Sequence, residues 1–430
     1  MEKIKISGVN EELYYHKLNN GLELFVVPNT NQKNYYITYN TKFGSNDTTF
    51  KSNNDTSYIT VPNGIAHYME HLMFNMEDGD AFQFFSKLGA SVNAFTTYDL
   101  TCYEVYSSTY FKENLNYLLD YVGTPYFNKK MIDNELGIIS EEIDMYKNNP
   151  NTELTFATYR NIFINDNRRY LISGEKEDIK KITVDDIMNC YNTFYNPNNM
   201  FVVITGNVNP YEALAIIEEN QKDKKFNNVY FNRKNINEPL KVKESYFVKE
   251  MNVEINKVSV TYKIPKKNFK KLNLSDEELY TYIEVLFDIL FGSSSDINEK
   301  LLSGKIVPNG INVNKTYTKD HIVVSLMTDS VYTETLINMI SETMKNISIN
   351  ECDLERKIKV LKSNYILHFD NIESVNNEIQ DSIINFNKFI DNNMDIYDSL
   401  NINKMNELIK CLKVRSESVL IIKPYDKKKK

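Results

Sequence analysis

The sequence has little glycine and cysteine and no long apolar run. Its 430 residues include 13 glycines and contain neither GxxxxGK[ST] nor GxGxxG, which argues against the common phosphate-binding loops. No stretch approaches the roughly 18 apolar residues of a membrane-spanning helix, and no apolar run typical of a signal peptide follows Met1. We therefore expect no membrane partner.

The four cysteines are far apart and form no CxxC pair; they are Cys102, Cys190, Cys352 and Cys411. This pattern is typical of reduced thiols, so we expect a cytoplasmic location. The net charge of −8 disfavours a nucleic-acid partner. With 42% hydrophobic and 25% charged residues, the composition is typical of a globular enzyme, and the length suggests two to three domains.

Two segments of the chain repeat one another. Residues 127–150 (FNKKMIDNELGIISEEIDMYKNNP) and 349–372 (INECDLERKIKVLKSNYILHFDNI) align without a gap. Ile132 superposes on Leu354 and other apolar residues follow at helical spacing, which predicts a helix in each copy. We infer two homologous halves that arose by an internal duplication.

Predicted strands flank both copies of this helix at matching places. They lie at 34–45 and 252–267, at 101–108 and 321–329, and at 200–206 and 418–424. Strands and helices in this mixed order predict an α/β or α+β fold for each half. We predict an N-terminal catalytic zinc-binding domain over 1–226, a linker over 227–245, and a C-terminal homologous domain without the metal motif over 246–430.

A candidate metal motif lies in VPNGIAHYMEHLMFNM (61–76), after a breaker cluster that includes Gly64. His67 and His71 are four residues apart, so both imidazoles face one side of a helix and could bind one zinc ion. Glu70 lies beside them and could accept a proton from zinc-bound water. The pattern HxxEH is the reverse of HExxH. The alternative is a helix with two partly buried histidines bonded to the backbone.

A catalytic zinc needs a third protein ligand and one open position. The first copy of the repeated helix offers Glu135 and Glu142, two turns apart on one face, whereas Glu141 points about 100° away. In the second copy these two acids are replaced by Lys357 and Asn364. The helix itself therefore does not require the acids, and a metal is the simplest explanation. The alternative is two surface acids on an acidic helix.

Three segments together resemble the insulinase/pitrilysin family of zinc metallopeptidases: GIAHYMEH (64–71), SVNAFTTYDLTCYEVYSS (91–108) and ELGIISEEIDMYKNNP (135–150). The resemblance covers nearly the whole chain and is greatest to bacterial members of this length associated with elongation factor P modification. Those are usually encoded as pairs, one subunit with the motif and one without. The implied fold is α+β, with two homologous metalloprotease-like (LuxS/MPP-like) α/β domains, each a mostly antiparallel sheet packed by helices.

The resemblance also implies roles for individual residues. His67, His71 and Glu142 would bind one zinc ion per chain, Glu70 would be the general base, and Glu135 would orient a ligating histidine. The segment that binds a peptide substrate by β-augmentation would consist of Asn93, Ala94, Phe95 and Thr96. An ordinary edge strand is the alternative for this segment.

The implied function is a zinc-dependent endopeptidase that cleaves peptides or small unfolded proteins in an enclosed chamber, with Glu70 activating zinc-bound water. The partner would be a second copy or a motif-free homologous subunit. Active family members often carry an arginine and a tyrosine after the FGS stretch of the second half, but residues 291–310 contain neither. The alternative is therefore a metal-bearing subunit of a heterodimeric peptidase or peptide-binding assembly, with little activity alone.

Overall fold

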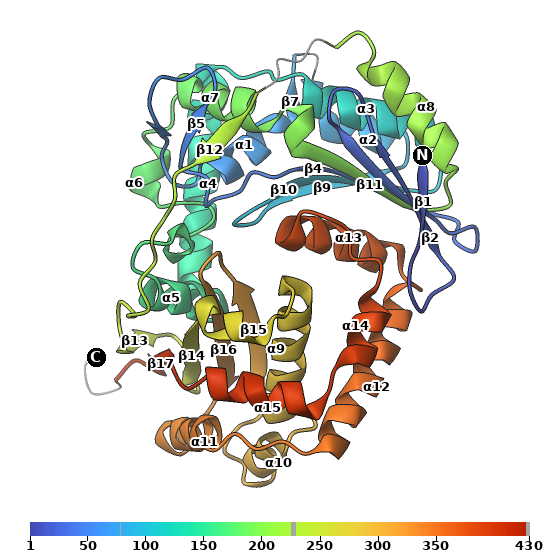
Figure 1. Ribbon diagram of the computed structural model, residues 1–430. Coiled ribbons are helices and arrows are strands. Elements are labelled where there is room, and N and C mark those ends of the chain that lie inside the picture. The colour runs from blue at the N-terminus through green and yellow to red at the C-terminus, as the bar shows by residue number, and fades with distance from the viewer. Residues whose placement is uncertain (78, 225–228, 427–430) are drawn as a thin grey trace. The chain divides into compact units, whose positions relative to one another are not determined.

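The computed structural model describes residues 1–77, 79–224 and 229–426 (Figure 1). The chain forms two compact units. Unit 1 comprises Met1–Ile143, Leu171–Asn235 and Tyr365–Asn392, and unit 2 comprises Asp144–Tyr170, Ile236–Asn364 and Asn393–Lys430. Two of the boundaries between the units fall inside α4 (Lys129–Asn148) and near the end of α12 (Glu351–His368). These are the two predicted copies of the repeated helix, and both are confirmed as helices.

The predicted division at 1–226, 227–245 and 246–430 follows the duplicated halves in chain order and stays a prediction. Its boundary between 226 and 227 lies outside the described residues. Part of the predicted linker forms a strand, β12 (Phe231–Arg233), which pairs with β5 (Thr49–Ser52).

A seven-stranded sheet forms the centre of unit 1, in the order β1-β2-β3-β11-β4-β10-β9. Its strands are β1 (Glu2–Lys5), β2 (Glu12–Lys17), β3 (Glu23–Pro28), β4 (Tyr35–Thr41), β9 (Ser91–Thr96), β10 (Thr101–Ser107) and β11 (Met200–Gly206). Among the described pairs, β3 and β11 are parallel and the others are antiparallel. The apolar run 200–206 is confirmed as a buried strand, β11.

Helices cover both faces of this sheet. Helix α1 (Ile65–Met73) packs against β9 and β10. Unit 1 also contains most of α4, together with α2 (Ala81–Lys87), α3 (Phe111–Gly123), α6 (Lys176–Ile179), α7 (Val184–Phe194), α8 (Pro210–Gln221) and α13 (Ile372–Phe386). Figure 1 shows α3 and α8 on one side of the sheet and α13 on the other. Because β4 is buried on both faces, its polar side chains need internal partners, and Thr38 donates to Asn376 of α13 at 2.8 Å. Two small sheets complete unit 1. One has three strands in the order β12-β5-β6, with β6 at Ile59–Thr60, and the other pairs β7 (Asn75–Met76) with β8 (Gly79–Asp80).

The sheet of unit 2 has the order β13-β17-β14-β16-β15. Its strands are β13 (Tyr246–Met251), β14 (Lys257–Pro265), β15 (Asn312–Tyr317), β16 (His321–Asp329) and β17 (Ser416–Pro424). This order repeats β3-β11-β4-β10-β9 of unit 1, and β13–β17 is parallel just as β3–β11 is. The predicted α+β fold with two homologous, mostly antiparallel sheets is confirmed.

Helices also cover both faces of the second sheet. The helices of unit 2 are α5 (Pro150–Ile162), α9 (Asp276–Phe291), α10 (Asp296–Ser303), α11 (Thr333–Lys345), most of α12, α14 (Asn393–Ser399) and α15 (Ile402–Cys411), with 3₁₀ helices η1 (Asn167–Arg169) and η3 (Lys266–Leu272). The main core lies among β14, β16, α9, α11 and α15. On the other face, Leu154 and Ala157 of α5 pack with Leu420 and Ile422 of β17.

The two halves of the sequence exchange a helix. The helix that follows α4 in the chain is α5, which packs on β14 and β17 in unit 2, whereas α13 follows α12 and packs on β4 and β11 in unit 1. Each sheet thus has one face covered by a helix from the other half of the sequence. Among the described residues, no helix combines the length and the apolar character needed to cross a membrane.

A buried ion pair lies in unit 2. The ammonium of Lys263, which is fully buried, donates to the Glu238 carboxylate. That carboxylate also accepts the backbone N–H groups of Ile164, Asn165 and Asp166 at 3.0, 2.7 and 2.8 Å. Burial alone would raise the pKa of Glu238, but the bonds from Lys263 and the three amides outweigh it and lower the pKa.

We predict that Lys263→Met lowers the free energy of unfolding by about 3 kcal/mol at pH 7, because it leaves one partner of a buried pair alone. Since the folded pKa of Glu238 is below its ordinary value of 4.5, the stability from this acid is present above that value and is lost as the pH falls through the folded pKa. Urea unfolding at pH 7 and at low pH measures both effects. The exposed Lys267→Met is the control, and equal stability of the two variants at pH 7 would contradict the prediction.

Candidate metal centre

Helix α1 carries both histidines of the HxxEH segment. It begins after Gly64, which has a φ of 87°. A Cβ on Gly64 would lie 2.4 Å from the carbonyl oxygen of Ser173, so both the left-handed backbone and the close approach require glycine. Every residue of α1 except His71 is buried, which holds the helix in one position.

Helix α4 contacts α1 through polar groups and has one buried apolar face. Ile132, Ile139 and Ile143 are its buried residues, and they recur at helical spacing. The Tyr68 hydroxyl of α1 donates to the Ile132 carbonyl at 2.6 Å. These contacts set the rotation of α4 and therefore decide which of its acids face α1.

Glu135 and Glu142 face the histidines. His71 Nδ1 lies 2.9 Å from Glu135 Oε1, and the Nε2 atoms of His67 and His71 each lie 3.5 Å from an oxygen of Glu142. The side chains of Glu135 and Glu142 are 15% and 19% exposed, so both acids are largely protected, whereas Glu141 is exposed. Glu135 and Glu142 thus lie on the side of α4 that meets the histidines, and Glu141 points away from it.

The residues fit a tetrahedral zinc ion. His67, His71 and Glu142 can each offer a ligand atom, and these atoms all lie within 4.8 Å of one another. Ligands about 2.0–2.1 Å from a tetrahedral zinc lie about 3.4 Å apart, close to the observed 3.5 Å between each Nε2 and a Glu142 oxygen. The other ring nitrogen of His71 is held by Glu135, as expected of an acid that orients a ligand.

The pKa of His71 reflects the negative charge of the two carboxylates in the cluster. Burial lowers its pKa, but hydrogen bonds to Glu135 and Glu142 outweigh burial and raise the pKa to about 10. Two carboxylates thus demand a positive charge at this place. A divalent cation held by the cluster would supply that charge and would compete with a proton on His71.

Glu70 lies on α1 next to the cluster. It is 7% exposed, and burial raises its pKa above the ordinary value, although the nearby His67 and a hydrogen bond from Thr96 oppose the shift. Thr96 Oγ1 donates to Glu70 Oε2 at 2.8 Å, which leaves Oε1 free to take a different partner. A buried carboxyl with a raised pKa is a better proton acceptor than a solvated one.

The segment Asn93–Thr96 lies in β9, an edge strand of the seven-stranded sheet whose paired neighbour is β10. Asn93 is directly opposite Glu104 of β10, and its Nδ2 donates to Glu104 Oε1 at 3.1 Å. The Tyr36 hydroxyl donates to the other oxygen of Glu104. Because a carboxylate only accepts, the amide of Asn93 has one orientation, with its Oδ1 left to accept from another group.

Sequence reasoning missed two of these interactions. It used Thr96 only as part of the edge strand, yet its side chain bonds to Glu70. Side chains alternate along a strand, so Thr96 and Asn93 lie on opposite faces of β9. This alternation could have indicated that the two side chains have different partners. Glu104 had no signal of its own, because its place opposite Asn93 depends on the register between β9 and β10.

The chain matches known proteins along most of its length. Residues 52–170 match the family described as insulinase (peptidase family M16), and residues 181–361 match the peptidase M16 inactive domain. The chain is 36% identical over 303 residues to "Uncharacterized zinc protease YmfH" of Bacillus subtilis, covering 70% of each protein. It is 28% identical over 229 residues to "Probable zinc protease PqqL" of Escherichia coli, covering 49% of this chain but 23% of that protein.

A solved structure described as an M16-like peptidase, from Alicyclobacillus acidocaldarius, has a TM-score of 0.88 at 24% identity and covers 97% of this chain and 99% of that one. A protease from Helicobacter pylori has a TM-score of 0.80 at 18% identity, covering 96% and 100%. The fold and the named relatives define the class, which is that of the zinc proteases. The chain belongs to the insulinase family, peptidase family M16.

We predict that Glu142→Gln abolishes stoichiometric zinc binding, because the cluster loses its only anionic ligand. Glu135→Gln should weaken zinc binding about 10–100-fold, since it acts through His71. Zinc content after dialysis and titration against a competing chelator measure both effects. The matched control is Glu141→Gln on the same helix, which should bind zinc as the unmodified chain does. Normal zinc content in Glu142→Gln would remove this residue from the ligand set.

Proposed function

We propose that the chain is a zinc-dependent endopeptidase that cleaves peptides or small unfolded proteins. The observation that carries this proposal is the convergence of His67, His71 and Glu142 beside the buried carboxyl of Glu70. The names of the relatives support the zinc and the protease class, and the site supports the assignment of roles. The substrate stays open.

The roles of the residues follow from their positions. His67, His71 and Glu142 would hold the zinc ion, which when bound supplies a Lewis acid and acidifies a water molecule. Glu70 would take the proton from that water with its free oxygen and later deliver it to the leaving amine. Thr96 would keep the Glu70 carboxylate in the required orientation through its hydroxyl.

The peptide would add a strand to the edge strand β9. Backbone hydrogen bonds along Asn93, Ala94, Phe95 and Thr96 would hold an extended chain with little dependence on its side chains. The Oδ1 atom of Asn93, oriented by Glu104, would accept a further N–H of the peptide. Backbone pairing along the edge of β9 and proton transfer at Glu70, which bonds to Thr96 of the same strand, would then act on the same peptide.

We further propose a second subunit that encloses the substrate, either another copy of the chain or a motif-free homologue. The absence of arginine and tyrosine from residues 291–310 favours the second candidate function, a metal-bearing subunit with little activity alone. Peptidase assays of the purified chain, alone and with a motif-free homologue from the same organism, distinguish the two. The four unpaired cysteines support a cytoplasmic location.

We predict that Glu70→Gln keeps its zinc but loses at least about 100-fold in kcat on fluorogenic peptides, because an amide cannot accept the proton. Zinc analysis and peptidase kinetics of the active form, alone or with its partner, make the comparison. Glu141→Gln, with its acid exposed on α4, is the control and should retain activity. Full activity of Glu70→Gln would refute its role as the general base.

Glu104→Gln should raise KM several-fold and change kcat little, because Glu104 acts on substrate through Asn93. The carboxamide that replaces the Glu104 carboxylate can both donate and accept, so it could hold the amide of Asn93 in either orientation. In a double-mutant cycle, Asn93→Ala and Glu104→Gln should be strongly non-additive in kcat/KM. Independent, additive effects would show that Glu104 does not act through Asn93.

A further inference from the structure

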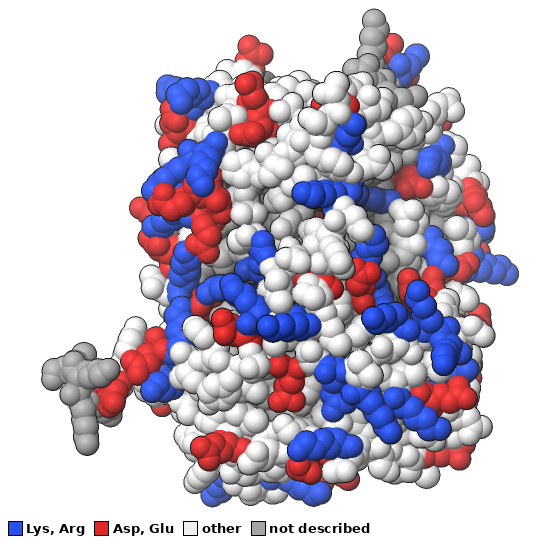
Figure 2. Space-filling view, turned by 60° about the vertical axis from the view of Figure 1, so that its left-hand side comes forward, with Lys and Arg blue, Asp and Glu red and all other residues white. Residues whose placement is uncertain are grey.

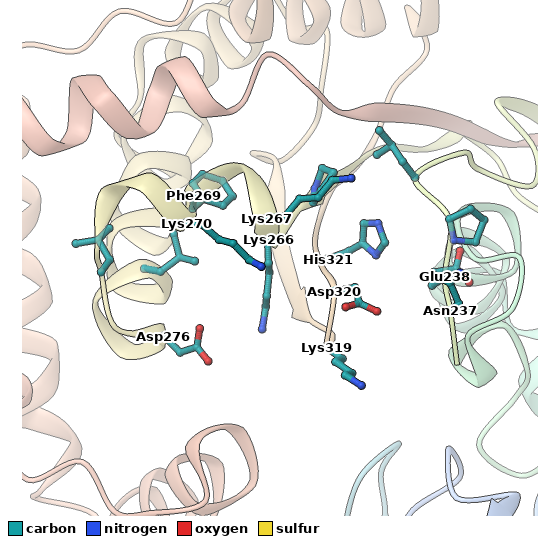
Figure 3. A pocket seen from close by; sticks show the side chains of 15 residues that line it. Asn237, Glu238, Lys266, Lys267, Phe269, Lys270, Asp276, Lys319, Asp320 and His321 are labelled. Carbon is teal, nitrogen blue, oxygen red and sulfur yellow. The ribbon is translucent and has the colours of Figure 1, made fainter. Parts of the chain in front are cut away.

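A cavity of about 610 Å³ lies in unit 2, and none of the metal-centre residues lines it. Its lining comes from four segments: residues 237–240, residues 265–270 at the end of β14 and in η3, residues 274–279 at the start of α9, and residues 319–321 before β16. Figure 3 shows side chains from these segments around a common space. The volume is within the range of about 300–1,000 Å³ typical of ligand pockets.

The lining is basic. Lys266, Lys267, Lys270 and Lys319 contribute four ammonium groups, against the carboxylates of Asp276 and Asp320. The remaining acid, Glu238, is already neutralised by the buried Lys263. The cavity therefore carries an excess of positive charge in a chain whose net charge is −8. Figure 2 shows that lysine and arginine side chains gather in several groups on one face of the molecule.

Two of these lysines have no partner in the described chain. Lys267 and Lys270 make no hydrogen bond or ion pair with any described residue, and both are exposed, whereas Lys266 donates to Tyr280 and lies over its ring. In Figure 3 both side chains extend from η3 along the lining of the cavity. Ammonium groups without an internal partner are available to an incoming carboxylate, because no existing ion pair has to be broken first.

The wall of the cavity offers a surface for an apolar group. Pro239, Leu240 and Leu274 are half-buried lining residues that present apolar surface, whereas Phe269 and Leu279 belong to the core of unit 2 and are only 3% and 6% exposed. An apolar wall with a few polar groups at defined places is the usual composition of a ligand pocket. The ligand should therefore combine negative charge with an apolar part.

His321 provides an independent sign of a ligand. It lines the cavity, is 4% exposed, and its Nδ1 has no hydrogen-bond partner within the described chain. Figure 3 places its ring between Lys267 and Glu238. Burial and then the ammonium of Lys263 lower the pKa of His321, so the ring is neutral near pH 7 and can offer a hydrogen bond. Buried polar atoms without partners are uncommon, and a bound ligand would provide one.

We propose that this cavity binds a peptide segment that carries two acidic side chains next to an apolar residue. The carboxylates would pair with Lys267 and Lys270, and the apolar residue would lie against the half-buried apolar residues of the lining. The backbone N–H groups of the peptide would donate to Asp276 and Asp320. This proposal goes beyond the proposed hydrolysis and does not depend on it.

The mixed charge of the lining favours a peptide over a nucleotide or polyphosphate. Asp276 and Asp320 would repel a ligand with three or four negative charges, yet they suit the donors of a peptide backbone. Phosphate sites typically use arginine forks or backbone N–H groups from glycine-rich loops. The lining contains neither an arginine nor a glycine.

The test is a binding titration that involves no cleavage. A fluorescein-labelled hexapeptide with two adjacent glutamates between leucines is titrated with the full-length Glu70→Gln protein, and its anisotropy is measured. In a second titration, both glutamates of the peptide are replaced by glutamines. We expect the glutamate peptide to bind at least about tenfold more tightly, with affinity that falls as salt is added.

Variants then assign the binding to the cavity. Lys267→Gln with Lys270→Gln should weaken the glutamate peptide about tenfold and leave the glutamine peptide unchanged. Lys271→Gln is the matched control, because Lys271 is an exposed lysine of η3 that does not line the cavity. Thermal unfolding checks that each variant is folded.

Three results would overturn the proposal. The first is equal affinity for the glutamate and glutamine peptides. The second is an unchanged affinity in the double variant, or an equal loss in Lys271→Gln. The third is displacement of the peptide by inorganic phosphate or AMP at lower concentrations than by unlabelled peptide, which would assign the cavity to a phosphate ligand instead.

Discussion

The metal centre depends on the contacts that place α4 beside α1. Three buried isoleucines and the bond from Tyr68 to Ile132 set the rotation of α4, and this rotation turns Glu135 and Glu142 toward His67 and His71. Two protected carboxylates in one place require a positive charge, because burying unpaired acids is unfavourable. The site is therefore a space built for a cation, and Glu70 lies at its edge.

The second half of the chain meets the same constraint in another way. Lys357, which takes the place of Glu135 in the repeated helix, is almost fully buried, and its ammonium lies 2.6 Å from Asp288 of α9. Here a lysine side chain supplies the positive charge that a cation would supply in the first half. The same helix packing thus supports either a metal site or a plain ion pair, depending on a few side chains.

The strand β9 links the metal centre to the peptide-binding proposal. Alternation along the strand directs Thr96 toward Glu70 and Asn93 toward Glu104, so each face of one short segment has a separate partner. Since β9 is an edge strand, its backbone can still pair with another chain. Orientation of a base and placement of a substrate would then depend on the same few residues.

The sequence by itself determined the repeated helix, the mixed order of strands and helices, the paired histidines and the acids that accompany them, whereas the α+β class came from the resemblance to a known family. These features are local, because helix and strand periodicity and the i, i+4 spacing on α1 can be read from neighbours in the chain. Only the tertiary structure decided which helix covers which sheet. The exchange of α5 and α13 between the halves, the pairing of Glu104 with Asn93, and the basic cavity all join residues far apart in the chain. Contacts of this kind depend on packing and strand register, and no periodicity in one sequence encodes them.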